Sequence, residues 1–152
     1  MRVALDTNVL AYLAGVSRSA EDDSKVARVR DLIEQLARTV TLLAPAQTLG
    51  ELFVVLRRGG TPPDQAREIV LRYAEAFTPS SSEGRTVVAA LDLAVDHKLQ
   101  FWDALIVTSA VDAGCSLLLS EDMQDGFVVR GLTIANPLAA TPHAKLAVLL
   151  QT

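Results

Sequence analysis

The chain has 152 residues, of which 50% are hydrophobic and 21% are charged. That size and composition fit one globular domain with a full core and exclude a disordered chain. The formal net charge is 14 − 18 = −4, so a broad basic surface for duplex nucleic acid is not expected. The longest apolar runs are five residues, as at 52–56, whereas a membrane-spanning helix needs about 20. We therefore expect a single domain over residues 1–152 and no membrane segment.

The first residues and the cysteine count bear on the cellular compartment. Asp6 interrupts the chain before the apolar region of a signal peptide could develop. The single cysteine, Cys115, cannot form an internal disulfide and fits a reducing compartment. We expect a cytoplasmic protein.

Hydrophobic periodicity predicts strands that alternate with helices. The first half reads as a strand at 3–5, a short helix from about 9, a polar loop at 17–24, a helix over 26–36 capped by Asp22, Asp23 or Ser24, a strand at 41–44, a helix at 46–58, and a helix from a Thr61 cap to about 77. The second half reads as at most a very short strand within 78–82, helices at about 87–95 and 102–113, strands at 116–119 and 132–135, and a helix at 144–150 in a tail that begins at 139. This alternation predicts the α/β class, with a mainly parallel sheet in a three-layer α/β/α sandwich.

Four acidic residues are expected at one edge of that sheet. Asp6 directly follows the first strand, and Asp122 comes just after the strand at 116–119. Glu51 lies in the first half of the helix that follows the second strand, and Asp103 lies at the start of a later helix. Ligands bind beyond the carboxyl ends of strands in such sheets, so these carboxylates should converge there.

A converging set of carboxylates predicts a site for a hard cation. Like charges held together in a cleft are unfavourable unless they are protonated or bind cations. Oxygen ligands of this kind select Mg²⁺, with Mn²⁺ as a substitute. Glu51 is the most telling member because it lies in a mostly apolar stretch at 49–53, where a solvated acid is less expected.

Several short motifs resemble those of one protein family. They are Asp6-Thr7-Asn8 after the opening strand, the isolated Glu51, Asp103-Ala104-Leu105-Ile106 at a helix start, the run from Ser120 to Gly126 after a strand, and Asn136-Pro137. Each motif is weak alone, but in this order they resemble PIN-domain ribonucleases, closest to the VapC-type toxins of toxin–antitoxin pairs.

The resemblance implies a fold, a site and an activity. The sheet would have five strands in the order 3-2-1-4-5, and Asp6, Glu51, Asp103 and Asp122 would be the catalytic, metal-binding set for one or two Mg²⁺ ions. Thr7, Asn8 and Ser120 would supply supporting hydrogen bonds. The protein would be a Mg²⁺-dependent endoribonuclease that forms a homodimer and is blocked by a small antitoxin. Asp125 would be either an accessory ligand or, as we favour, a turn residue before Gly126.

Contacts to RNA have weaker support in the sequence. Five arginines are candidates for phosphate contacts, although each one alone fits a solvated helix face: Arg57, Arg58, Arg67, Arg72 and Arg85. Trp102 and Phe101 could stack on a base, although such a pair beside a helix start is more often part of the core. His97 and His143 have no partner at zinc spacing.

Three other functions are compatible with parts of the pattern. A haloacid-dehalogenase-like phosphatase also begins with a strand and an Asp, but it needs a second Asp where Asn8 stands. A phospho-acceptor receiver domain needs paired acids at the first strand and a suitably placed lysine, which neither Lys98 nor Lys145 provides. A catalytically silent RNA- or protein-binding module of the same fold would not need four intact acids.

Overall fold

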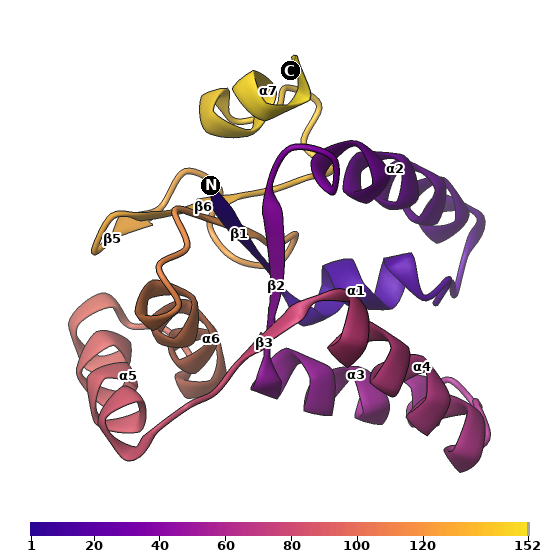
Figure 1. Ribbon diagram of the computed structural model, residues 1–152, viewed down its shortest axis with the longest axis horizontal. Coiled ribbons are helices and arrows are strands. Elements are labelled where there is room, and N and C mark those ends of the chain that lie inside the picture. The colour runs from indigo at the N-terminus through magenta and orange to yellow at the C-terminus, as the bar shows by residue number, and fades with distance from the viewer. Residues whose placement is uncertain (152) are drawn as a thin grey trace.

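The computed structural model describes residues 1–151 as a central sheet between two layers of helices (Figure 1). The strands are β1 (Arg2–Leu5), β2 (Thr41–Pro45), β3 (Thr78–Ser80), β4 (Leu117–Leu119), β5 (Val128–Val129) and β6 (Leu132–Ala135). The helices are α1 (Thr7–Leu13), α2 (Ala20–Leu36), α3 (Ala46–Arg58), α4 (Pro63–Ala76), α5 (Gly84–His97), α6 (Phe101–Asp112) and α7 (Ala144–Leu150). The predicted α/β/α sandwich is confirmed.

The sheet has one strand more than predicted. Its order is β3-β2-β1-β4-β6-β5, and every neighbouring pair is parallel except β5 with β6. The five parallel strands thus have the predicted order 3-2-1-4-5. The sixth, β5, has two residues and joins β6 through a tight turn at Arg130 and Gly131, both at positive φ. So short a strand carries no periodic signal in the sequence.

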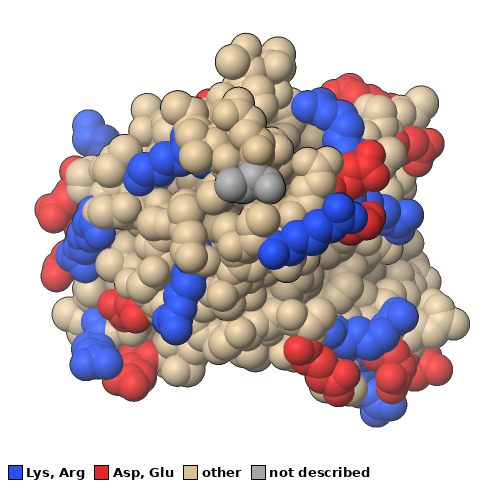
Figure 2. All heavy atoms as spheres, turned by 45° about the horizontal axis from the view of Figure 1, so that its top comes forward, with Lys and Arg blue, Asp and Glu red and all other residues tan. Residues whose placement is uncertain are grey.

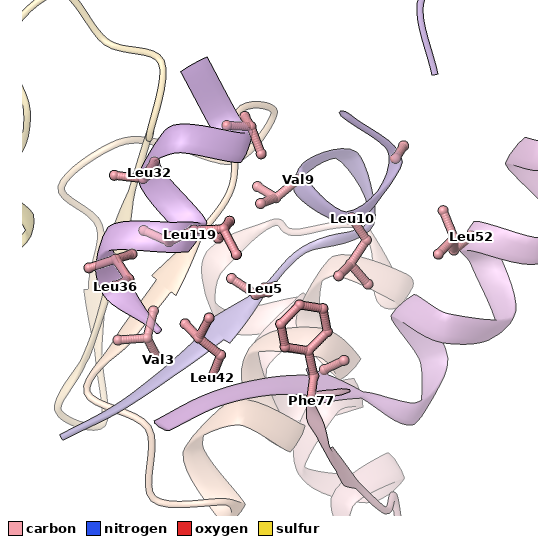
Figure 3. Close-up of a cluster of buried hydrophobic side chains, with 14 of the residues drawn as sticks. Val3, Leu5, Val9, Leu10, Leu32, Leu36, Leu42, Leu52, Phe77 and Leu119 are labelled. Atoms are coloured by element: carbon pink, nitrogen blue, oxygen red, sulfur yellow. The ribbon is translucent and has the colours of Figure 1, made fainter. Parts of the chain in front are cut away.

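Side chains of the central strands alternate between two cores. On one face, Val3 and Leu5 of β1 pack with Leu42 of β2 and Leu119 of β4. Helices α1, α2, α3, α4 and α7 contribute to this core, and Figure 3 shows its side chains pointing toward one another. Ala4, between Val3 and Leu5, faces the other side. The sheet is therefore covered on both faces, as its unbroken apolar strands predict.

Helices α5 and α6 cover the second face. Their residues Ala90, Leu93 and 104–107 pack on Leu43 and Leu118 of the sheet. Figure 1 shows these two helices on the opposite side of the sheet from α1, α3 and α4. Helix α6 begins beside the carboxyl ends of the strands. Its first turn therefore lies at that edge of the sheet.

The start of α2 differs from the prediction. The segment 20–24, predicted as loop, is the first turn of the helix, and Ser19 caps it by accepting a hydrogen bond from the Asp22 backbone N–H at 3.2 Å. Neither Asp22, Asp23 nor Ser24 is the cap. Acids in a first turn interact favourably with the positive end of the helix dipole, so the polar run belongs to the helix. Thr61 is likewise not the cap of α4, where the N-cap position is Pro62.

Helix α5 has apolar residues on both faces. Ala90 and Leu93 are buried, whereas four large side chains point outward: Val87, Val88, Leu91 and Val95. We call these four the α5 stripe. Helical spacing predicts the helix but does not show which face meets the core.

The surface carries no single field of positive charge on the face seen in Figure 2. Lysine, arginine and acidic groups lie interspersed around a neutral centre, in keeping with the net charge of −4. None of the helices within residues 1–151 is long and apolar enough to cross a membrane.

Candidate active site

Hydrogen bonds of the sheet bring Asp6 and Ser120 together. The Asp6 backbone N–H donates to the carbonyl of Leu119 at 3.0 Å, which continues the β1–β4 ladder past the last residue of β1. Ser120 follows β4 directly, and its Oγ donates to Asp6 Oδ2 at 2.6 Å. Asp6 also caps α1 by accepting from the Thr7 N–H through Oδ1 at 2.7 Å. The Asp6 carboxylate is therefore fixed in place and only 5% exposed.

Glu51 is joined to the same strand end through Thr7. The Thr7 Oγ1 donates to Glu51 Oε2 at 2.7 Å. Helix α3 starts directly after β2, and β2 lies beside β1 in the sheet, so the second turn of α3 rises next to Asp6. Thr7 was predicted to supply a supporting hydrogen bond, and in the structure its hydrogen bond holds Glu51.

The four acidic residues line one cleft of about 350 Å³. We call Asp6, Glu51, Asp103 and Asp122 the acidic quartet. Asp103 lies in the first turn of α6, and Asp122 lies exposed in the loop after β4. The four residues that we predicted to converge at the carboxyl edge of the sheet therefore line the same cleft.

Asn8 joins two members of the quartet. Its Nδ2 donates to Asp6 Oδ2 at 3.0 Å and to Asp122 Oδ2 at 3.2 Å. Its Oδ1 accepts from the Glu121 backbone N–H at 3.2 Å. Because one amide group spans α1 and the β4–β5 loop, Asn8 fixes the separation of Asp6 and Asp122.

Burial and nearby negative charges raise the pKa of two members of the quartet, Asp6 and Asp103. Burial, with smaller contributions from the charges of Asp103 and Glu51, raises the pKa of Asp6 to about 6, although the Ser120 and Thr7 hydrogen bonds act in the opposite direction. Burial and then the charges of Glu51 and Asp122 also raise the pKa of Asp103. A positive charge in the cleft would relieve this repulsion.

The donor chemistry of the cleft fits a divalent cation. All four acids offer hard oxygen ligands, and three of them carry unfavourable charge interactions with one another. Among residues 1–151, however, no three acidic, histidine or cysteine side chains lie close enough to enclose an ion. Hard oxygen donors that line one cleft are the ligands that divalent cations such as Mg²⁺ or Mn²⁺ prefer.

Asp125 lies away from this cleft and has a structural contact. Its Oδ1 accepts from the Asn136 backbone N–H at 2.8 Å, and it precedes Gly126, whose φ is 79°. This agrees with the interpretation of Asp125 as a turn residue. The bond also ties Asn136, which resembles the family pattern, to the loop that carries Asp122.

Two residues that the sequence analysis did not single out, Tyr12 and Lys25, hold that loop from the other side through Glu121. Glu121 accepts from the Tyr12 hydroxyl at 2.7 Å and pairs with Lys25 at 2.7 Å. Burial and the Glu121 contact raise the pKa of Tyr12 to about 12, and the hydrogen bond to Glu121 raises the pKa of Lys25. Tyr12 could have been found from its spacing of four residues after Asn8, which puts both on one face of α1.

Other residues considered in the sequence have different positions. Cys115 is buried in the second core, and His143 caps α7 by accepting from the Lys145 backbone N–H at 3.2 Å. Trp102 is 59% exposed, whereas the adjacent Phe101 packs against the core. The cation that reaches the cleft is Arg18, which was not among the predicted arginines.

Comparison with known proteins identifies the family. The family model of the PIN domain matches residues 3–125, which is most of the chain and includes the whole acidic quartet. The chain therefore belongs to the PIN-domain family, as the motif order predicts. A search of curated proteins found no match.

Solved structures of the same fold include toxin–antitoxin proteins. One is VapBC2 from Rickettsia felis bound to a promoter DNA fragment, with 16% identity, a TM-score of 0.65, and coverage of 88% of this chain and 97% of that one. A toxin–antitoxin complex from Klebsiella pneumoniae has 17% identity, a TM-score of 0.64 and coverage of 89% and 97%. The sarcin-ricin loop cleaving toxin VapC20 from Mycobacterium tuberculosis has 17% identity, a TM-score of 0.62 and coverage of 76% and 86%. At these identities the likeness shows the fold.

The raised pKa of Asp6 predicts a pH-dependent stability without metal. The folded protein binds the Asp6 proton more tightly than the unfolded chain, whose pKa is near 3.8, so this contribution to stability is present at low pH and is lost as pH rises from about 4 through 6. Relative to Asp6→Asn, wild type should lose up to about 1.4 kcal/mol per pH unit in that window. Urea unfolding of both proteins in EDTA at several pH values measures this difference. Parallel curves for the two proteins would contradict the assigned shift.

Proposed function

We propose that this PIN-domain protein is a divalent-metal-dependent endoribonuclease and the toxin of a toxin–antitoxin pair. The observation that carries the proposal is the acidic quartet, which comes from four distant parts of the chain and lines one cleft at the carboxyl edge of the sheet. Carboxylates crowded in this way destabilise a fold unless they bind a cation, which suggests a functional reason for their arrangement. Mg²⁺ is the expected ion, and Mn²⁺ should replace it.

The chain's own residues prepare the cleft for a phosphodiester. Asp6 is immobilised by Ser120, Thr7 and Asn8, so its oxygens are positioned before any ligand arrives. Thr7 holds Glu51 in the same cleft. Asp103 and Asp122 complete the set of ligands, and Arg18 at the rim is available to a phosphate oxygen.

A bound divalent cation supplies activation of a water for in-line attack on phosphorus and neutralises charge on the leaving 3′ oxygen. The quartet would hold it, with Asp6 as the fixed ligand. Asp6, Glu51 and Asp103 must be unprotonated for this, so metal binding and proton binding compete in the cleft.

RNA is the substrate class that we infer from the structural neighbours. One of them is described as a toxin that cleaves the sarcin-ricin loop, and we carry over only the class, not that loop. An RNA substrate is consistent with the cytoplasmic location expected from the sequence. The net charge of −4 and the interspersed surface charges (Figure 2) disfavour duplex DNA, which needs many phosphate contacts.

A phosphatase of the haloacid dehalogenase type has less support. Its chemistry needs a second aspartate at the place of Asn8, and the Asn8 amide is already committed to Asp6, Asp122 and the Glu121 N–H. If the protein were a catalytically silent binding module, the crowding of the acidic quartet would serve no function.

We also propose a homodimer and a small antitoxin as partners. Similar structures are toxin–antitoxin complexes, and the α5 stripe provides exposed apolar surface, with Val88, Leu91 and Val95 each at least half exposed. The stripe lies on the layer opposite α1 and α3. It is a better candidate for the dimer contact than Val55 or the C-terminal tail, because Val55 packs on the first core and Leu146 is buried in it.

Purified protein should cleave total cellular RNA in Mg²⁺ or Mn²⁺ and lose this activity in EDTA. Gel analysis followed by mapping of the new ends measures both the activity and its sites. Undiminished cleavage in EDTA by the pure protein would overturn the proposed metal dependence.

Asp122→Asn and Asp125→Asn form a matched pair within that assay. Asp122 lies in the cleft, so its amide variant should lose at least about tenfold in activity, as is typical when a metal ligand or its support is removed. Asp125 accepts a hydrogen bond from the Asn136 N–H and does not line the cleft, so Asp125→Asn should retain most of the activity. Equal losses at saturating Mg²⁺ would mean that the loop as a whole sets the metal site.

The α5 stripe predicts a change of oligomeric state. Leu91→Arg should convert the dimer into a monomer, because it places a charge in the apolar contact. Leu71→Arg on α4 is a matched control, since Leu71 is 50% exposed and Leu91 51%. Sedimentation velocity of the three proteins decides the point, and a wild type that is monomeric at micromolar concentration contradicts the proposed dimer.

A further inference from the structure

A second hollow lies next to the acidic cleft. Its volume is about 540 Å³, and it is lined by Gln47, Gly50, Glu51, Val54, Val55, Arg58 and Trp102. We call it the Trp102 groove. The size is within the usual range for small-ligand sites. Trp102 forms one wall with more than half of its surface exposed, which is unusual for the largest aromatic side chain unless it meets a ligand or a partner.

The groove and the acidic cleft are continuous. Glu51 and Val55 line both of them. The remaining α3 residues of the groove follow at helical spacing, so one face of α3 runs from Gln47 past Glu51 to Arg58. Glu51 and Arg58 are seven residues apart, or about 10 Å along the helix. A polymer that lies over Glu51 at the cleft can therefore extend along α3 into the groove.

The far end of the groove carries a cation that is free to bind. Within residues 1–151, Arg58 has no hydrogen-bond or ion-pair partner, and it is exposed. Its neighbour Arg57 donates to the Thr61 carbonyl at 2.6 Å and does not line the groove. Two adjacent arginines thus differ in whether they can serve a ligand in the groove.

The start of α6 is held in a fixed relation to α3. The Gln47 Nε2 donates to the backbone carbonyl of Trp102 at 3.3 Å, and Phe101 lies edge-on to the Trp102 ring with the ring centroids 5.1 Å apart. Gly50 leaves the floor of the groove open, because no atom lies within 4 Å of where a Cβ would be. The groove is therefore preformed and does not depend on a rearrangement of Trp102.

We propose that the Trp102 groove binds the nucleotide next to the cleaved phosphodiester, with its base on the Trp102 ring and a phosphate at Arg58. This inference rests on the proposed ribonuclease function. Aromatic rings stack on bases irrespective of sequence, and guanidinium groups bind phosphate oxygens. The groove would therefore hold single-stranded RNA in register with the acidic quartet.

A nucleotide fits the groove better than a protein segment does. An apolar partner surface would leave the Arg58 guanidinium facing it without a counter-charge, whereas a phosphate supplies that charge. The residues of the α5 stripe, by contrast, line neither the Trp102 groove nor the acidic cleft. The two surfaces thus suit different partners.

Trp102 is the only tryptophan in the chain, so its fluorescence reports on the groove directly. Titration of Asp122→Asn with short single-stranded RNA in Mg²⁺ should quench that fluorescence, because the variant is expected to cut RNA much more slowly than wild type and so to leave time for binding to be measured. A parallel titration with labelled RNA, followed by anisotropy, measures binding independently of the tryptophan.

Variants in the groove should weaken RNA binding in that anisotropy assay. Trp102→Ala should weaken it by roughly tenfold or more, and Trp102→Phe should recover most of the loss, as expected for stacking. Arg58→Ala should weaken binding, with a smaller dependence on salt, whereas Arg57→Ala should not. Circular dichroism and thermal melts check that each variant is folded.

The glycine at the floor gives a test that removes no ligand-binding group. Gly50→Leu fills much of the groove and should weaken RNA binding by more than Gly50→Ala, which adds a single methyl group there. Both substitutions are compatible with the helix and with the open space at this position.

Each alternative outcome separates this inference from the proposed function. If RNA is bound and the wild type cuts it, but fluorescence is unchanged and the groove variants bind normally, the inference is wrong and the ribonuclease function stands. If RNA is neither bound nor cut, both are wrong. A fluorescence change that depends on protein concentration without RNA would instead assign the groove to a second copy of the chain and overturn the inference.

Discussion

The arrangement of the whole site depends on the buried carboxylate of Asp6. Asp6 directly follows β1, and its side chain caps α1 and accepts hydrogen bonds from Ser120 and Asn8. The ends of two strands and the start of a helix are thus fixed around one negative charge. Burial raises its pKa to about 6, which means that the fold holds a charge where water would hold it better. The remaining acids then approach an anion that cannot move away, and a cation is the group that relieves all of these interactions together.

Hydrogen bonds extend that constraint outward through two layers of side chains. Thr7 and Asn8 connect Asp6 to Glu51 and Asp122, and the contact of Tyr12 and Lys25 with Glu121 holds the Asp122 loop from behind. Along α3, the same wall that carries Glu51 continues to the Trp102 groove. The acidic cleft, the Trp102 groove and the hydrogen bonds that support them are therefore connected, and a change in α1 or α3 is expected to affect all three.

The sequence predicted those features that follow from strand ends and helix starts. Asp6 and Asp122 follow strands, and the carboxyl ends of parallel strands share one edge, so their convergence could be derived. The contact of Lys25 with Glu121 could not, because it depends on how α2 packs and because the first turn of α2 was interpreted as loop. The outward face of α5 was also not predictable: Val87, Leu91 and Val95 have the same spacing that a buried face would have.

The central claim is that the acidic quartet binds a cation and that, without the cation, the quartet destabilises the fold. Thermal melts of wild type and Asp103→Asn, each in EDTA and in Mg²⁺, test it most directly. The account predicts that the variant is as stable as wild type in EDTA or more stable by about 1 kcal/mol. It also predicts that Mg²⁺ stabilises wild type more than the variant. If Asp103→Asn melts well below wild type in EDTA and Mg²⁺ shifts both proteins equally, Asp103 is a structural residue and the account of the site is wrong.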